Sequence, residues 1–112
     1  MYAIHILFVC SRNRWRSLTA EKIFNGVNGH VVRSAGTEEK ARIRVTAGLI
    51  GWADWILVME RKHIQRLKEK FPMGLQGKKL ICLDIPDEYG YMDEELIGLL
   101  ESSVSAYVNL HN

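Results

Sequence analysis

A cysteine, three arginines and a closing serine stand together between residues 10 and 17. The segment reads Cys-Ser-Arg-Asn-Arg-Trp-Arg-Ser, so five residues separate Cys10 from Arg16, and Ser17 follows directly. A short loop that leads into a helix can turn successive backbone N–H groups inward and bind a tetrahedral oxyanion, and the helix dipole adds positive potential. The same field favours the thiolate form of Cys10, which is the nucleophilic form. The spacing therefore predicts a phosphate-binding loop that carries a cysteine nucleophile.

The other side chains of this loop fit the same interpretation. Arg16 has a planar fork of donors that suits bidentate capture of two phosphate oxygens. Asn13 suits a left-handed backbone position, Ser17 could hydrogen-bond to the thiolate, and Trp15 could form a wall of the pocket. The residues predicted to bind phosphate are Ser11, Arg12, Asn13, Arg14, Trp15, Arg16 and Ser17. The simplest alternative is a buried cysteine beside a solvated, arginine-rich turn.

The sequence around the loop predicts the elements that would position it. Residues 3–9 are apolar apart from His5, as in a strand buried on both faces of a parallel sheet. Residues 17–25 have helical spacing and are followed by glycines. Further strands are predicted at residues 31–34, 55–59 and 79–83, a weak helical turn at 46–52 and a helix at 60–71. A last helix is predicted after Asp93, with an apolar stripe formed by Leu96, Leu100, Val104, Tyr107 and Val108.

This alternation of strands and helices predicts the α/β class, as one domain over residues 1–112. The expected architecture is an open, parallel, four-stranded sheet with helices on both faces and the phosphate-binding loop after the first strand. Ligands of such sheets bind beyond the carboxyl ends of the strands, near the point where the strand order reverses. The Cys10 loop and the loop at residues 84–92 both begin at such ends.

Charge is distributed unevenly along the chain. All fifteen Lys and Arg lie in residues 1–83 together with six acidic residues, a net charge of +9, whereas residues 84–112 hold seven acidic residues and no base, a net charge of −7. A basic body attracts anions, but nucleic-acid binding usually comes with a larger basic excess and interleaved aromatic residues. We therefore expect a phosphate-sized ligand and no nucleic-acid partner.

Targeting signals and metal motifs are not apparent in the sequence. The N-terminus has no positively charged leader, and no apolar run is long enough to span a bilayer, so we expect a cytoplasmic protein without a membrane partner. Cys10 and Cys82 are the two cysteines and are expected to be separate thiols, with Cys82 buried and inert. The four histidines show no ligand spacing, so none is given a role and no metal or organic cofactor is predicted. The oligomeric state is left open.

Several further segments support a family resemblance. They are Arg-Ser-Ala-Gly-Thr at residues 33–37, Ala-Asp-Trp-Ile-Leu-Val-Met at 53–59 and Leu-Asp-Ile-Pro-Asp-Glu-Tyr at 83–89. Together with the Cys10 loop, they make the chain resemble the low-molecular-weight protein tyrosine phosphatases over most of its length. The resemblance implies a two-step hydrolysis of phosphotyrosine in a protein, or of a small aryl phosphate. Cys10 would form a phosphocysteine, Arg16 would hold the phosphoryl group and Asp87 would be the general acid. Apart from the resemblance, the aromatic rings of Trp15 and Tyr89 could form a wall for an aryl substrate.

The chain also departs from the pattern of that family. Glu88 stands where the family has proline, so Asp84 remains a rival for the general acid. The segment between Gly36 and Thr46 is much shorter, which removes a helix and a wall on the substrate side. Some members have a second cysteine in the loop, where this chain has Arg14 and Trp15.

Two other functions remain open at this stage. One is a module that binds phosphate or a phosphorylated protein without catalysis. The weaker one is an arsenate reductase, which would need a resolving thiol, and Cys82 is the sole candidate in the sequence.

Overall fold

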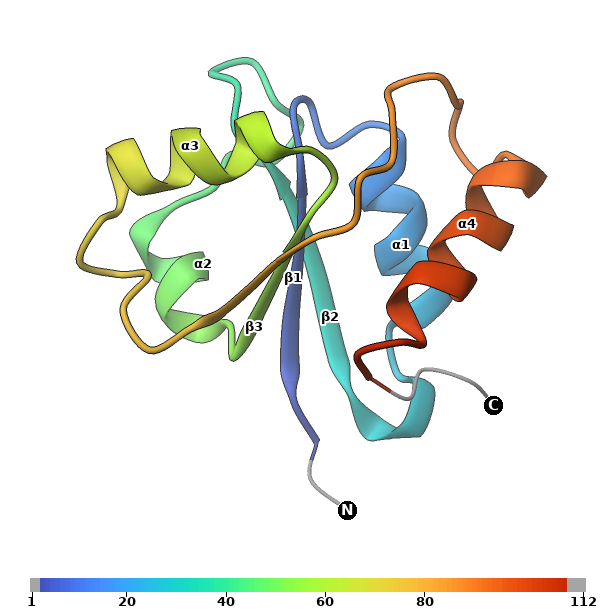
Figure 1. Ribbon diagram of the computed structural model, residues 1–112, viewed down its shortest axis with the longest axis horizontal. Helices are drawn as coiled ribbons and strands as arrows, with labels where there is room; N and C mark the ends of the chain where they lie inside the picture. The colour runs from blue at the N-terminus through green and yellow to red at the C-terminus, as the bar shows by residue number, and fades with distance from the viewer. Residues whose placement is uncertain (1–2, 109–112) are drawn as a thin grey trace.

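The sheet has four parallel strands in the order β2-β1-β3-β4. The computed structural model describes residues 3–108 (Figure 1). The strands are β1 (His5–Cys10), β2 (Val31–Gly36), β3 (Trp55–Val58) and β4 (Lys79–Cys82). β1 lies inside the sheet because it pairs with β2 on one side and with β3 on the other.

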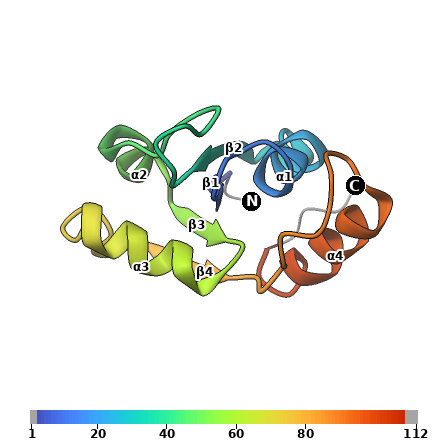
Figure 2. The ribbon, with the colours of Figure 1, turned by 90° about the horizontal axis from the view of Figure 1, so that it is seen from above.

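Helices cover both faces of this sheet (Figure 2). They are α1 (Arg16–Phe24), α2 (Ala47–Trp52), α3 (Arg61–Lys70) and α4 (Glu94–Val104), with a short 3-10 turn η1 (Val27–Gly29) before β2. One core cluster packs α1 and α4 against the sheet, and a second packs α2 and α3 against the opposite face. The predicted fold class, an open parallel sheet with helices on both faces, is confirmed.

Burial on both faces explains why β1 reads as a continuous apolar run. Ile6 and Phe8 enter the core under α1 and α4, whereas Leu7 and Val9 enter the core under α2 and α3. All four side chains are fully buried. A strand with this environment needs apolar residues at every position rather than at alternate ones.

The strand order places the end of β1 where a ligand site is expected. The chain passes from β1 to β2 on one side and then returns to β3 on the other, so the strand order reverses at β1. Cys10 is the last residue of β1 and is in register with Gly36 at the end of β2. Ligands of open parallel sheets bind at such a reversal, beyond the carboxyl ends of the strands.

Two details differ from the sequence-based expectations. α4 ends at Val104, so the predicted stripe is too long: Tyr107 lies in a turn and is exposed, although Val108 still packs against the core. Cys82 is half-buried rather than buried, because it lies at the end of the edge strand β4. Within residues 3–108, no helix has the length and apolar character needed to cross a membrane.

Candidate active site

The sulfur of Cys10 is buried and accepts hydrogen bonds from its own loop. The backbone N–H of Asn13 points at Cys10 Sγ at 3.2 Å, and Ser17 Oγ lies 2.9 Å from the same sulfur. Ser17 Oγ also accepts a hydrogen bond from Asn13 Nδ2 at 2.7 Å, so its own hydrogen can point at the sulfur at 2.9 Å or at the carbonyl oxygen of Ala35 at 3.5 Å. Asn13 and Ser17 therefore place two polar donors around one sulfur.

Asn13 takes the left-handed conformation that the sequence predicted. Its φ is 58°, and its side chain is fully buried. Positive φ at this position turns the backbone N–H of Asn13 toward the sulfur, so the backbone and the side chain of one residue each reach a different polar partner. Asparagine is among the few residues other than glycine that adopt this conformation readily.

The carbonyl groups of the loop face outward, onto residues 37–42. The carbonyl oxygens of Cys10 and Ser11 accept from the N–H groups of Thr37 and Glu38, at 2.9 Å each. The carbonyls of Arg12 and Asn13 both accept from Arg42, through its backbone N–H at 3.0 Å and its side-chain Nε at 3.1 Å. Four successive carbonyls bound on the outside leave the opposite, concave side of the loop to its N–H groups, which is the arrangement of an anion-binding nest.

Gly36 makes this close contact possible. A Cβ atom at this position would lie 2.5 Å from the carbonyl oxygen of Ser11 and 2.6 Å from the Cβ of Ala41. Both distances are far below any real contact, and one of the neighbours is backbone that cannot turn away. The segment after β2 therefore packs directly on the phosphate-binding loop.

Arg16 is buried and held in a fixed orientation. Its side chain is 2 % exposed, and Nη1 donates to Glu60 Oε2 at 2.9 Å and to the carbonyl oxygen of Ile85 at 2.7 Å. These two bonds use the hydrogens of Nη1, so Nε and Nη2 keep three N–H donors. Nε faces Asp87 Oδ1 at 3.7 Å. Because Arg16 also lines the pocket that opens over Cys10, these donors are available to an anion bound there.

The structure separates the two candidates for the general acid. Asp87 lines the same pocket as Cys10, and half of its side chain is exposed. Asp84 instead accepts a hydrogen bond from Cys82 Sγ at 3.3 Å and lines a shallow hollow with Glu60. Its φ is 55°, so the chain turns sharply as it leaves β4. Of the two carboxylates, Asp87 is therefore the one that lies at the Cys10 pocket, and its role as the general acid stays a prediction.

His63, one of the histidines that show no ligand spacing in the sequence, lies against the phosphate-binding loop. His63 is fully buried at the start of α3. Its Nδ1 accepts from the backbone N–H of Glu60 at 3.0 Å, so its Nε2 carries the hydrogen and donates to Ser11 Oγ, also at 3.0 Å. Glu60 is the N-cap of α3 and the partner of Arg16. The start of α3 thus supports both ends of the phosphate-binding loop.

Both groups at the start of α3 have shifted acidities. Burial lowers the pKa of His63 to about 4, and the nearby charge of Arg16 contributes in the same direction. Burial alone would raise the pKa of Glu60, but its hydrogen bond to Arg16 and the charges of Arg16 and Lys62 bring it below its ordinary value. At neutral pH the pair is therefore a neutral imidazole and a carboxylate, which is the state that the hydrogen bonds require.

We expect His63 to make the fold less stable in mild acid. Its pKa is lower in the folded protein than the ordinary value of 6.5, so the unfolded chain binds the proton more tightly and stability falls as the pH drops from 6.5 toward 4. Between pH 7 and pH 5 this contributes a loss of about 2 kcal/mol in the free energy of unfolding, to which Glu60 adds in the same direction. Urea unfolding of the wild type and of His63→Gln at both pH values measures this. An equal loss in both proteins would contradict the assignment.

Some of the other residues predicted to form the site line the pocket over Cys10, and some do not. The pocket over Cys10 is lined by Cys10, Ser11, Arg12, Arg14, Trp15, Arg16 and Asp87. Trp15 is thus at its rim, 45 % exposed. Tyr89 packs against the core instead, and its hydrogen bond with Glu95 raises the pKa of the phenol. Its role as a substrate wall stays a prediction, as does that of Trp15.

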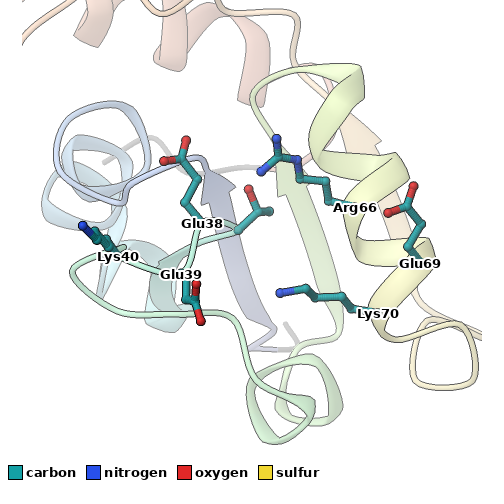
Figure 3. A pocket seen from close by; sticks show the side chains of 7 residues that line it. Glu38, Glu39, Lys40, Arg66, Glu69 and Lys70 are labelled. Carbon is teal, nitrogen blue, oxygen red and sulfur yellow. The ribbon is translucent and has the colours of Figure 1, made fainter.

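A wider hollow lies beside the loop and carries no nucleophile. It has a volume of about 600 Å³, and Figure 3 shows it between residues 37–40 on one side and α3 on the other. Its lining side chains carry both charges: Glu38, Glu39, Lys40, Arg66, Glu69 and Lys70. The ion pair between Glu38 and Arg12, at 3.6 Å, joins this hollow to the loop. This hollow is larger than the pocket over Cys10, but the sulfur of Cys10 lies in the smaller one.

The second cysteine is too far from Cys10 to form a disulfide. Cys82 lies at the end of β4, and β3 separates that strand from β1. Two strand spacings amount to about 9.5 Å, whereas the Cα atoms of a disulfide lie about 4.4–6.8 Å apart. Burial, the largest of several causes, raises the pKa of Cys82, so this thiol is a poor nucleophile at neutral pH.

A buried cysteine lies at the end of a central parallel strand, with a fixed arginine and an exposed carboxylate at the same pocket, an arrangement that suits a cysteine-dependent phosphate site. Comparisons with solved structures give the same fold. Wzb of Vibrio vulnificus, in complex with benzylphosphonate, superimposes with a TM-score of 0.76 at 25 % identity, over 95 % of this chain and 97 % of that one. Wzb of Escherichia coli K30, a tyrosine phosphatase in complex with phosphate, gives a TM-score of 0.73 at 22 % identity, over 95 % and 96 %.

A third similar structure has a different stated activity. The arginine phosphatase YwlE of Geobacillus stearothermophilus gives a TM-score of 0.69 at 22 % identity, over 96 % of this chain and 99 % of that one. No family model and no curated protein matches the sequence. The chain thus has the fold of the low-molecular-weight protein tyrosine phosphatases, which confirms the resemblance that its motifs indicated.

Proposed function

We propose that this protein is a cysteine-dependent phosphomonoester hydrolase that acts on phosphotyrosine in proteins or on small aryl phosphates. The observation that carries the proposal is the pair of hydrogen bonds from Asn13 and Ser17 to the sulfur of Cys10, at the base of a pocket that Arg16 and Asp87 also line. These groups include a nucleophile, an anion-stabilising fork and a proton donor, which together meet the needs of phosphate-ester cleavage.

In the first step, the Cys10 thiolate attacks phosphorus on the side opposite the leaving oxygen. The loop N–H groups and Arg16 hold the nonbridging oxygens, and the P–O bond to the leaving group breaks as the S–P bond forms. Asp87, in its protonated form, gives its proton to the leaving oxygen. In the second step, the carboxylate of Asp87 takes a proton from water, whose oxygen attacks phosphorus and releases inorganic phosphate and the thiolate. The chemistry requires no metal ion or organic cofactor.

The alternative functions are less well supported by the geometry. A module that only binds phosphate would not need Asp87 at the pocket or two donors directed at a buried sulfur. An arsenate reductase would need a second thiol within reach of Cys10, and Cys82 lies two strands away. We keep the cytoplasm as the proposed location, because a cysteine nucleophile needs reducing surroundings to stay active. No nucleic-acid or membrane partner is proposed.

The proposal is tested by turnover of para-nitrophenyl phosphate in the presence of a metal chelator. We expect hydrolysis that is inhibited by vanadate, which resembles the pentacoordinate phosphorus of the transition state. A panel of peptides that carry phosphotyrosine, phosphoserine or phosphoarginine then identifies the substrate class, since similar folds carry out tyrosine and arginine dephosphorylation. Binding of phosphate without turnover of any of these compounds would instead support the non-catalytic module.

A further inference from the structure

Three of the seven residues that line the Cys10 pocket are arginines: Arg12, Arg14 and Arg16. One phosphoryl group needs a single bidentate arginine in addition to the loop N–H groups. The other two cations are therefore more than the phosphoryl group itself requires. Their partners in the structure show which of them is free to bind something else.

Two of these arginines already have acidic partners. Arg16 is bonded to Glu60 and faces Asp87, so its charge is shared before any ligand enters. Arg12 lies 3.6 Å from Glu38 in an exposed ion pair, so its charge is shared as well. Both arginines are thus partly neutralised before a second anion binds.

Arg14 differs from both. Its side chain is exposed, and it makes no hydrogen bond or ion pair with any residue between 3 and 108. It lies four residues after Cys10 and next to the half-exposed Trp15. Asp87 is the one acidic residue that lines this pocket, and it faces Arg16. The rim of the pocket therefore holds one unpaired guanidinium with all five donors open to a ligand.

We propose that Arg14 selects substrates that carry a second anionic group close to the phosphoryl group that occupies the Cys10 loop. This inference rests on the proposed function and names the substrate class of the same site. The second group is a carboxylate or a phosphate, since both match the planar fork of arginine. In a protein substrate it belongs to an acidic residue beside the phosphorylated one. In a small substrate it is a second substituent of the aryl ring. The net charge of +9 in residues 1–83 attracts both kinds of substrate.

Binding is measured with the Cys10→Ser variant, so that the test does not depend on turnover. The probes are a pentapeptide with a central phosphotyrosine flanked by alanines, the same peptide flanked by aspartates, phenyl phosphate and 3-carboxyphenyl phosphate. We expect the aspartate peptide to bind roughly fivefold more tightly than the alanine peptide, the gain of one exposed charged contact, and less so at 0.5 M salt. In an otherwise identical protein that also carries Arg14→Ala, the ratio should fall to near one.

Arg66→Ala provides the matched control. Arg66 is an equally exposed arginine of α3 that lines the neighbouring hollow, so its removal changes the net charge by the same amount without touching the Cys10 pocket. We expect the ratio between the two peptides to persist in this variant. A ratio that survives Arg14→Ala, or that falls equally in Arg66→Ala, overturns the proposal, because selection would then come from elsewhere or from the overall field.

The two small probes identify the source of the second anion. A preference for 3-carboxyphenyl phosphate over phenyl phosphate that depends on Arg14, with no preference between the peptides, assigns the site to small aryl phosphates. A preference for the aspartate peptide that depends on Arg14, with no preference between the two small probes, assigns it to acidic peptides. Either result supports the proposal. Failure of the proposed function is seen separately, as the absence of turnover by the wild type, and the binding ratio still decides the role of Arg14.

Discussion

Replacement of Cys10 by serine should abolish turnover of para-nitrophenyl phosphate while the protein still binds phosphate. A serine hydroxyl is a far weaker nucleophile than a thiolate at neutral pH, and the two groups that are hydrogen-bonded to the sulfur, Ser17 and the backbone N–H of Asn13, are not bases that could activate it. We expect kcat to fall by roughly 10⁴-fold or more, the scale on which loss of a nucleophile acts in covalent catalysis.

Cys82→Ser is the matched control for this prediction. The same chemical change is made at the end of β4, where the hydroxyl can still donate to Asp84. Turnover should stay near that of the wild type. Phosphate binding by Cys10→Ser, measured by calorimetry, shows that the loop is intact. Activity that survives in Cys10→Ser, or that is lost equally in Cys82→Ser, would remove Cys10 from the mechanism.

Asp87→Asn should be the second most damaging substitution, and its effect should depend on the leaving group. Loss of a general acid costs about 10²- to 10⁴-fold. The loss is largest for phenyl phosphate, whose leaving oxygen is basic, and much smaller for an activated aryl ester that departs without a proton. Measurement of kcat/KM over a series of substituted phenyl phosphates gives this dependence directly, as the slope of log kcat/KM against the basicity of the leaving oxygen.

Asp84→Asn distinguishes the two carboxylates. Asp84 lies at the start of the loop, bonded to Cys82 and outside the Cys10 pocket, and asparagine tolerates its positive φ, so the effect on turnover should be similar for every leaving group. The dependence on the leaving group should remain that of the wild type. If this dependence changes in Asp84→Asn and not in Asp87→Asn, the assignment of the acid is wrong. If it changes in neither, no carboxylate of this loop is the general acid.

The sequence was sufficient for the parts of the site that one segment encodes. The nucleophile, the arginine and the left-handed asparagine stand at fixed spacings within eight residues, and that spacing reflects a local geometry. Similarly, the apolar run of β1 and the alternation of elements were enough to predict the fold class. These predictions depend on short-range periodicity, which a single sequence displays directly.

The contacts that support the loop could not be predicted in the same way. His63, Glu60 and Arg42 reach it from positions that are 29 to 52 residues away in the chain. Nothing in their spacing marks a contact with Cys10, and a lone histidine near a helix start is usually a surface or capping residue. One signal was present: the Met-Glu-Arg-Lys-His segment directly follows a strand whose carboxyl end belongs to the same edge as Cys10.

The predicted end of α4 was wrong for a related reason. Tyr107 and Val108 continue the helical spacing of Leu100 and Val104, so periodicity alone extends the helix to them. The structure has a turn at Ser105, and no glycine or proline marks the end in the sequence. Ends without such signals are set by tertiary packing, which periodicity does not reveal.

The site draws its parts from four separated stretches of chain: residues 10–17, 36–42, 60–63 and 84–87. No fragment that lacks one of these stretches contains a complete anion nest, so the nest and the hydrophobic core should form in the same cooperative transition. A ligand that binds only the complete nest then stabilises the entire fold by mass action, by about 2.7 kcal/mol when its concentration is 100 times its dissociation constant. In the cell, a supply of phosphorylated substrate would thus extend the lifetime of the folded chain as well as occupy its pocket.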